Sequence, residues 1–241
     1  MKRTVTFGEI MLRLKTPEHM RILQTDAFEA SYGGAEANVA VSLAVLKDPV
    51  SFVTKLPENP VGTAALNEVR RYGADTSKVV IGGSRLGIYF FEKGTDIRPT
   101  NVVYDREGSA LALAKPQEFH WDEILKDTDI FYFSGVTPAV SENIAKAVLE
   151  ALKYCKAHGI ETVCDLNYRS KMWDTKKAQS VMSELMNYVT LCIANDEDFE
   201  SSLGIHAYDG DISKGIDQVE SYKAGMKEIQ NRYPNCKAVA S

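Results

Sequence analysis

The sequence predicts an α/β fold in which a mostly parallel β-sheet is covered by helices and a small second sheet is added. Short β-branched runs alternate with amphipathic helical segments along most of the 241 residues. The run DIFYFSG at 129–135 is apolar on both faces, which is typical of an interior parallel strand. Two segments, 11–32 and 86–109, interrupt the alternation and indicate the additional sheet.

The remaining elements follow in a regular order. Strands are predicted at 4–8, 50–56, 129–135, 160–167, 190–195 and 237–241. Helices are predicted at 35–46, at about 176–187 and at about 214–232. Two further helices are indicated by apolar stripes, one made of Val61, Ala65, Val69 and Tyr72 and the other of Ile144, Val148, Leu152 and Cys155. We expect Ser141 to cap the second of these helices and Gly159 to end it.

The two interrupting segments predict a β-hairpin and its neighbours. The stretches 87–94 and 101–108 are strand-like, and Gly94 and Pro99 supply turn residues between them. Such a sheet could be a lid over the ligand crevice at the carboxyl ends of the main strands, or an interface patch. We therefore expect an α/β core, incomplete at its C-terminal end, and a β lid. The core comprises 1–10, 33–85 and 110–241, and the lid comprises 11–32 and 86–109.

Composition and charge disfavour several classes of partner and site. The formal net charge is −5, with no basic block, which disfavours a nucleic-acid partner. No apolar stretch is long enough to predict a signal peptide or a membrane span, so we expect no membrane partner and a cytoplasmic location. Cysteines and histidines show no metal-binding or nucleophilic spacing, and we expect the four cysteines to be reduced core thiols. The cysteines are Cys155, Cys164, Cys192 and Cys236, and the histidines are His19, His120, His158 and His206.

The stretch SYGGAEANVAVSLA at 31–44 places two glycines just before a predicted helix. Gly33 and Gly34 could make a tight corner only, or they could let a ligand approach bare backbone at a helix N-terminus. Asn38, in the first turn of that helix, offers both a donor and an acceptor, which suits a polyol.

Five stretches, taken together, resemble the ribokinase-like (PfkB-type) carbohydrate kinases, and most closely their 2-keto-3-deoxygluconate kinase branch. They are GEIMLRL at 8–14, YGGAEANVA at 32–40, VVYDREGSA at 102–110, DLNYR at 165–169 and IANDEDFESSLGI at 193–205. The resemblance runs over the whole chain in order and spacing. It implies a ribokinase-like, Rossmann-type sheet with a β lid.

The resemblance also implies a sugar pocket. Tyr104 and Arg106 are two residues apart on one predicted strand and so share a face, where the ring can cover a carbon skeleton and the guanidinium can pair with a carboxylate. A solvated edge strand would also explain them. The implied sugar-binding residues are Gly33, Gly34, Asn38, Tyr89, Tyr104, Arg106, Asn167 and Arg169.

Two other segments follow predicted strands. Arg169 lies where ligands of a parallel sheet collect, and the resemblance places it on the sugar carboxylate, while Asp165 is interpreted as an orienting or structural group. Asn195 and Asp198 match the family segment that helps to organise Mg²⁺ and the phosphates of ATP. Acidic residues at a helix start have the alternative explanation of favouring the helix dipole.

The chain also departs from the family pattern. Lys47 stands where family members often have a glycine at a helix end. No Gly-Ala-Gly-Asp motif, whose aspartate is the family's catalytic base, occurs in the 241 residues. The strand-like KAVAS at 237–241 suggests that the sheet continues, so we expect the base beyond the C-terminus and no turnover by this chain alone.

The expected function is therefore ATP- and Mg²⁺-dependent phosphorylation of 2-keto-3-deoxygluconate or a similar sugar acid, with this chain carrying mainly the sugar-binding half. A homodimer formed through the lid is also expected, because a small sheet is marginal alone. Two alternatives stay open: a fructose or ribose kinase of the same fold, and a non-catalytic fragment that binds sugar acids. Arg106 and Arg169 favour the sugar acid, since a neutral sugar would leave them poorly compensated.

Overall fold

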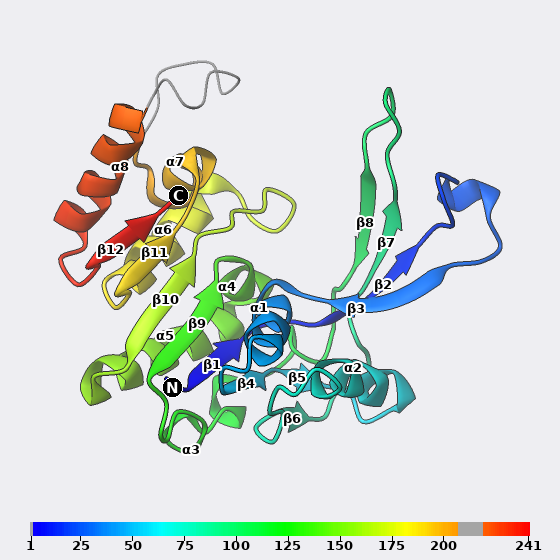
Figure 1. Cartoon of the computed structure of the whole chain (residues 1–241), viewed down its shortest axis with the longest axis horizontal. Coiled ribbons are helices and arrows are strands. Elements are labelled where there is room, and N and C mark those ends of the chain that lie inside the picture. The colour runs from blue at the N-terminus through cyan, green and yellow to red at the C-terminus, as the bar shows by residue number, and fades with distance from the viewer. Residues whose placement is uncertain (1, 207–218) are drawn as a thin grey trace. The chain divides into compact units, whose positions relative to one another are not determined.

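The computed structural model describes residues 2–206 and 219–241 and divides the chain into two compact units. The first unit comprises residues 5–118, and the second comprises residues 2–4 and 119–241. Both contain parallel strands with helices packed against them, and the first also holds a separate small sheet. The predicted fold class is confirmed (Figure 1).

The first unit contains the neighbouring strands β1 and β4, two helices and two further sheets. Its elements are β1 (Thr4–Phe7), β2 (Met11–Lys15), η1 (Ile22–Gln24), β3 (Glu29–Gly33), α1 (Ala35–Val45), β4 (Val50–Val53), β5 (Lys55–Leu56), α2 (Pro60–Arg70), β6 (Val80–Ile81), β7 (Ile88–Glu92), β8 (Asn101–Asp105) and η2 (Pro116–Glu118). The predicted strand 50–56 is divided into two strands, β4 and β5, that belong to different sheets. β5 pairs in parallel with β6.

The small sheet has the strand order β3-β2-β7-β8 (Figure 1). β2 pairs antiparallel with β3 and parallel with β7, and β7 pairs antiparallel with β8. The hairpin expected between 87 and 108 is therefore present as β7 and β8. The other two strands of the small sheet, β2 and β3, come from the segment 11–32 and the adjoining Gly33. Whether this sheet acts as a lid stays a prediction.

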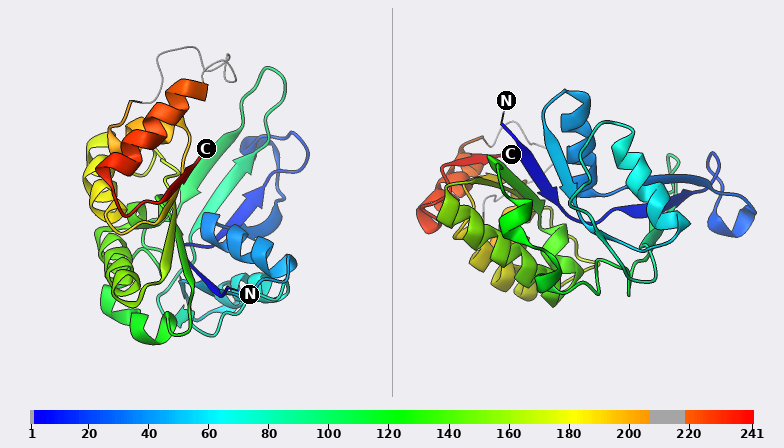
Figure 2. Two further views of the ribbon diagram at one scale, coloured as in Figure 1. Left: turned by 60° about the vertical axis from the view of Figure 1, so that its left-hand side comes forward. Right: turned by 90° about the horizontal axis from the view of Figure 1, so that it is seen from below.

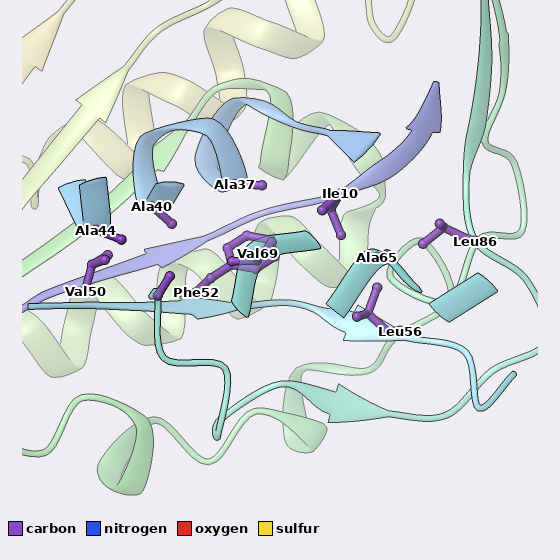
Figure 3. Close-up of a cluster of buried hydrophobic side chains, with 11 residues drawn as sticks. Ile10, Ala37, Ala40, Ala44, Val50, Phe52, Leu56, Ala65, Val69 and Leu86 are labelled. Atoms are coloured by element: carbon purple, nitrogen blue, oxygen red, sulfur yellow. The ribbon is translucent and has the colours of Figure 1, made fainter. Parts of the chain in front are cut away.

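The core of the first unit lies between α1, α2 and β4, as the cluster of buried side chains in Figure 3 shows. Small residues on α1 (Ala37, Ala40 and Ala44) allow that helix to lie close to Val50 and Phe52 of β4. The predicted stripe of α2 is only half correct: Ala65 and Val69 are buried, whereas Val61 and Tyr72 are 40% and 39% exposed. The helix buries a narrow face made of small side chains.

The second unit contains four parallel strands in the order β12-β11-β10-β9. Its elements are α3 (Trp121–Ile124), β9 (Ile130–Ser134), α4 (Val136–Val140), α5 (Glu142–His158), β10 (Glu161–Asp165), α6 (Thr175–Met186), β11 (Leu191–Ile193), α7 (Asp196–Leu203), α8 (Val219–Arg232) and β12 (Ala238–Ala240). The predicted strand at 237–241 is confirmed. The part of the predicted helix 214–232 that precedes α8 lies outside the described residues.

Helix α5 packs against β10 (Figure 2). It begins and ends at the residues that the sequence predicts. The Ser141 hydroxyl accepts a hydrogen bond from the Ile144 N–H at 3.3 Å, and Gly159 ends the helix with a φ of 69°, in the left-handed region. The four residues of its predicted apolar stripe are fully buried. Burial raises the pKa of the last of them, Cys155, to about 12. All four cysteines are free and buried, as expected.

Lys47 follows α1 with a φ of 69°, in the backbone region that glycine adopts most readily. The N–H of Asp48 donates to the Leu43 carbonyl at 3.0 Å and closes the helix end. The chain therefore keeps the turn that a glycine would make and accommodates a lysine in it. Among the described residues, no helix has the length and apolar character needed to cross a membrane.

Candidate sugar-binding and phosphate-binding residues

A row of side chains crosses the small sheet on one face. Ser31, Arg13, Tyr89 and Tyr104 are directly opposite one another on β3, β2, β7 and β8. Directly opposed residues of neighbouring strands project to the same side of a sheet, so these four form one face. The rings of Tyr89 and Tyr104 lie 5.8 Å apart. The structure thus brings the two predicted tyrosines together.

Gly33 ends β3 beside this row. A Cβ atom at Gly33 would lie 3.5 Å from Asn38 Oδ1 and 3.9 Å from the Tyr89 hydroxyl. The Asn38 side chain is exposed, and Tyr89 is half-buried. The missing side chain of Gly33 therefore leaves space bordered by an amide and a phenol. These are neutral donors and acceptors of the kind that hydroxyl groups require.

Gly34 needs no ligand to explain it. A Cβ atom there would lie 1.8 Å from the backbone carbonyl oxygen of Glu9. This distance is a steric clash with the backbone, so the fold requires glycine at this position. Gly34 is also the N-cap of α1, and its carbonyl accepts the Asn38 N–H at 2.8 Å. Packing therefore accounts for Gly34, whereas a Cβ atom at Gly33 would make only ordinary van der Waals contacts.

Arg106 follows β8 and forms an ion pair with Glu9. The side chains are 15% and 4% exposed, so this pair is withdrawn from solvent. The Ser109 hydroxyl donates a second hydrogen bond to Glu9, at 2.7 Å. A buried carboxylate must be compensated in this way, because an isolated buried charge is very costly. The positive charge of Arg106, which the sequence analysis assigned to a sugar carboxylate, is thus already balanced within the chain.

Two residues of the quoted motif GEIMLRL were not singled out from the sequence. Glu9 anchors Arg106, and Arg13 lies at the centre of the face that carries Tyr89 and Tyr104. A signal was available, since an acid and an arginine interrupt an otherwise apolar run. Charged residues in such positions require a partner.

In the second unit, Asp165 is the last residue of β10, and the predicted site residues Asn167 and Arg169 follow the strand. Asn167 has a φ of 38°, a left-handed conformation that asparagine tolerates better than most residues. Arg169 is exposed, and its guanidinium donates to the Tyr168 carbonyl at 3.3 Å. The tight backbone at Asn167 sets the direction in which the chain leaves the sheet.

Burial raises the pKa of the Asp165 carboxyl above its usual value, and the neighbouring Asp198 carboxylate adds to the effect. Arg169 and the backbone N–H of Asn167 act in the opposite direction. Burial likewise raises the pKa of the Tyr89 phenol, against a lowering by Arg13.

Asn195 and Asp198 form a reciprocal cap at the start of α7. Asn195 Oδ1 accepts the Asp198 N–H at 2.9 Å, and Asp198 Oδ2 accepts the Asn195 N–H at 3.3 Å. The second Asp198 oxygen, Oδ1, accepts the Tyr168 N–H at 2.7 Å. The buried carboxylate joins the helix start to the segment after β10. Asp198 thus has a structural role at the start of α7, as part of a hydrogen-bonded cap.

A magnesium site would need oxygen ligands free to face the ion. Both oxygens of Asp198 are engaged by backbone N–H groups. Across residues 2–206 and 219–241, no three or more His, Cys, Asp or Glu side chains come together as a metal site. The described residues do not by themselves fit Mg²⁺, and Asp198 is accounted for as a structural group.

The predicted residues thus fall into two sets. One set, in the first unit, contains Gly33, Asn38, Tyr89 and Tyr104 around a common face, with Gly34 and Arg106 in the packing beneath. The other set, in the second unit, contains Asn167 and Arg169 after β10, and Asn195 and Asp198 at α7.

Comparisons with known proteins agree with the motifs. A 2-dehydro-3-deoxygalactonokinase from Haloferax volcanii is 38% identical over 207 residues, which are 86% of this chain and 64% of that protein. A 5-dehydro-2-deoxygluconokinase from Geobacillus thermodenitrificans is 26% identical, over 85% of this chain and 62% of its own length. The chain therefore spans less than two thirds of the length of these curated relatives.

A solved structure of a related kinase is also similar to this chain. The crystal structure of a 2-dehydro-3-deoxygluconokinase from Thermotoga maritima is 45% identical and superposes with a TM-score of 0.93, covering 99% of this chain and 71% of that one. The model of the pfkB family of carbohydrate kinases matches residues 1–232. With the fold and the motifs of both units in agreement, the chain belongs to the pfkB carbohydrate kinase family.

Proposed function

We propose that this chain carries the sugar-binding residues of an ATP-dependent kinase that phosphorylates 2-keto-3-deoxygluconate, its galactonate epimer or a similar sugar acid. The observation that carries the proposal is the group formed by Gly33, Asn38 and Tyr89. An amide and a phenol beside a glycine suit the hydroxyl groups of a polyol, and the ring of Tyr104 can cover its carbon skeleton.

The acid is favoured over a neutral sugar by two arguments. Arg169 is exposed after β10, and a guanidinium pairs well with a carboxylate. Relatives named for the 2-dehydro-3-deoxy acids, whose 2-dehydro group is a ketone, are 38% and 45% identical to this chain. A fructose or ribose kinase is the alternative within the fold, and a non-catalytic sugar-acid binder is the alternative outside enzymes.

ATP is the proposed phosphoryl donor, accompanied by Mg²⁺, which would supply charge neutralisation on the transferred phosphate. The part that we assign to this chain is to bind and orient the sugar. We assign no general base among the described residues, since Asp165 contacts the Asn167 N–H. We further propose a cytoplasmic location and a homodimer formed through the small sheet.

Calorimetric titration of the chain tests the substrate class. We expect 2-keto-3-deoxygluconate or 2-keto-3-deoxygalactonate to bind at least about tenfold more tightly than fructose or ribose, because a charge-assisted contact contributes about 1.5–3 kcal/mol. Equal affinity for fructose would contradict the sugar-acid proposal. The two epimers, measured in parallel, establish which configuration the pocket prefers.

A coupled assay of ADP release, with ATP and Mg²⁺, tests the catalytic assignment. Without a positioned base, turnover should be about 10²–10⁴ times slower than in a kinase that has one. A rate typical of kinases, about 1–100 per second, would show that the base lies within these 241 residues.

A further inference from the structure

Arg13 is a cation on the small sheet for which the described residues supply no ion-pair partner. It is the central residue of β2 and is half-buried. Its guanidinium carbon lies 4.1 Å from the ring centroid of Phe91. Among residues 2–206 and 219–241, its side chain has no hydrogen-bond or ion-pair partner, and its Nε atom is buried without an acceptor. Such a group is costly unless something else compensates it.

The neighbouring cations of the first unit are balanced. Arg106 pairs with Glu9, and Arg85 pairs with Asp105 at 2.8 Å. Lys15, two residues along β2 on the same face as Arg13, pairs with Glu29 at 2.7 Å. Within residues 2–206 and 219–241, Arg13 thus differs from these neighbouring cations in having no ion-pair partner.

Arg13 lies next to Tyr89, and Tyr89 lies next to Gly33. Arg13 is directly opposite Tyr89 on β7. The Tyr89 hydroxyl in turn lies 3.9 Å from the Cβ position of Gly33. Arg13 is close enough to lower the pKa of the Tyr89 phenol, against the raising effect of burial. An anion bound beside Gly33 and Tyr89 is therefore within the influence of the Arg13 charge.

We propose that Arg13 is a specificity-determining residue whose guanidinium binds the carboxylate of the sugar acid. This assignment rests on the proposed function and adds to it a residue outside the predicted site. The ring of Phe91 lies against the guanidinium. A guanidinium has the planar arrangement of N–H donors that matches a carboxylate. A neutral sugar would leave the half-buried charge uncompensated and would bind less tightly.

A cycle of two proteins and two ligands tests the proposal. The ligands are 2-keto-3-deoxygluconate and its amide, which is neutral and nearly identical in shape. The proteins are the unaltered chain and Arg13→Gln, with dissociation constants from calorimetry. We expect the unaltered chain to prefer the acid at least about tenfold, and this preference to fall at least about threefold in Arg13→Gln, which still has Arg169.

Lys15→Gln is the matched control, since it removes one charge from the same strand and the same face. It should keep the preference for the acid. Arg13→Lys retains the positive charge but lacks the planar guanidinium with its paired N–H donors. Its preference for the acid over the amide should therefore be intermediate. Thermal unfolding of each variant reports folding, and Arg13→Lys still decides the question if the glutamine variant does not fold.

The outcomes separate the two proposals. If the unaltered chain prefers the acid, and the preference is unchanged in Arg13→Gln or Arg13→Lys, the role of Arg13 is wrong and the proposed function stands. If the unaltered chain does not distinguish the acid from the amide, the sugar-acid proposal and the role of Arg13 both fail.

Discussion

At the scale of single residues, Asp165 has a carboxyl group whose folded-state pKa is raised by burial and by Asp198. A carboxyl of this kind favours the folded state when it is protonated. That contribution is present at low pH and is lost as the pH rises from the unfolded pKa, about 3.9, through the folded pKa. The ionised form of Asp165 therefore opposes folding at neutral pH.

We predict that Asp165→Asn raises the unfolding temperature at pH 7. Asparagine has nearly the same shape and can still accept the Asn167 N–H, but it carries no charge to desolvate. The difference from the unaltered chain should shrink towards zero at pH 3. Thermal unfolding followed by circular dichroism at several pH values measures it. The control Asp26→Asn, at an exposed position, should show no such difference. An unchanged or lower unfolding temperature for Asp165→Asn at pH 7 would contradict the prediction.

At the scale of elements, the start of α7 and the segment after β10 are joined by one carboxylate. Asp198 accepts the Asn195 N–H and the Tyr168 N–H and is buried. We predict that Asp198→Ala destabilises the chain by about 2 kcal/mol, because two N–H groups lose their acceptor. Denaturant unfolding without nucleotide measures the change.

Glu197→Ala is the control for this prediction. Glu197 is the exposed neighbour of Asp198 in the same helical turn, so its loss removes a charge near the helix N-terminus without removing the cap. It should cost no more than about 0.5 kcal/mol. Equal destabilisation by both substitutions would mean that the helix dipole, rather than the cap, explains the acid-rich start.

At the scale of the whole molecule, one face of the small sheet is apolar. Leu14, Phe90 and Val103 are directly opposite one another across β2, β7 and β8. Phe28 packs edge-on against Phe90 at 5.6 Å, and Val103 stays 46% exposed. Val102 is opposite Phe91 on the other face of the sheet.

We predict that the chain forms a homodimer in which this apolar face is covered, because exposed apolar surface is stabilised by burial. Light scattering after size exclusion, at micromolar concentration, should give twice the mass of 26.7 kDa. Val103→Lys should shift the mass to that of the monomer. Thr95→Lys, in the turn of the same hairpin, should not. A monomeric unaltered chain would contradict the prediction.

The sequence alone determined what depends on near neighbours. Residues a few positions apart decide where α5 is capped by Ser141 and ended by Gly159, and which face of it is buried. One quoted motif contains Gly33 and Asn38, and the family resemblance added Tyr89. The structure brings these three residues together. The family followed from the same motifs.

Only the tertiary structure decided which charges are balanced. Glu9 and Arg106 are separated by 97 positions, and Asp198 and the Tyr168 N–H by 30. No local pattern indicates such pairs, because they depend on how strands from distant parts of the chain are ordered in a sheet. The order β3-β2-β7-β8 placed Arg13 opposite Tyr89 while Glu9 neutralised Arg106. Coulombic interaction and desolvation depend on distance in space, and that distance exists only once the chain has folded.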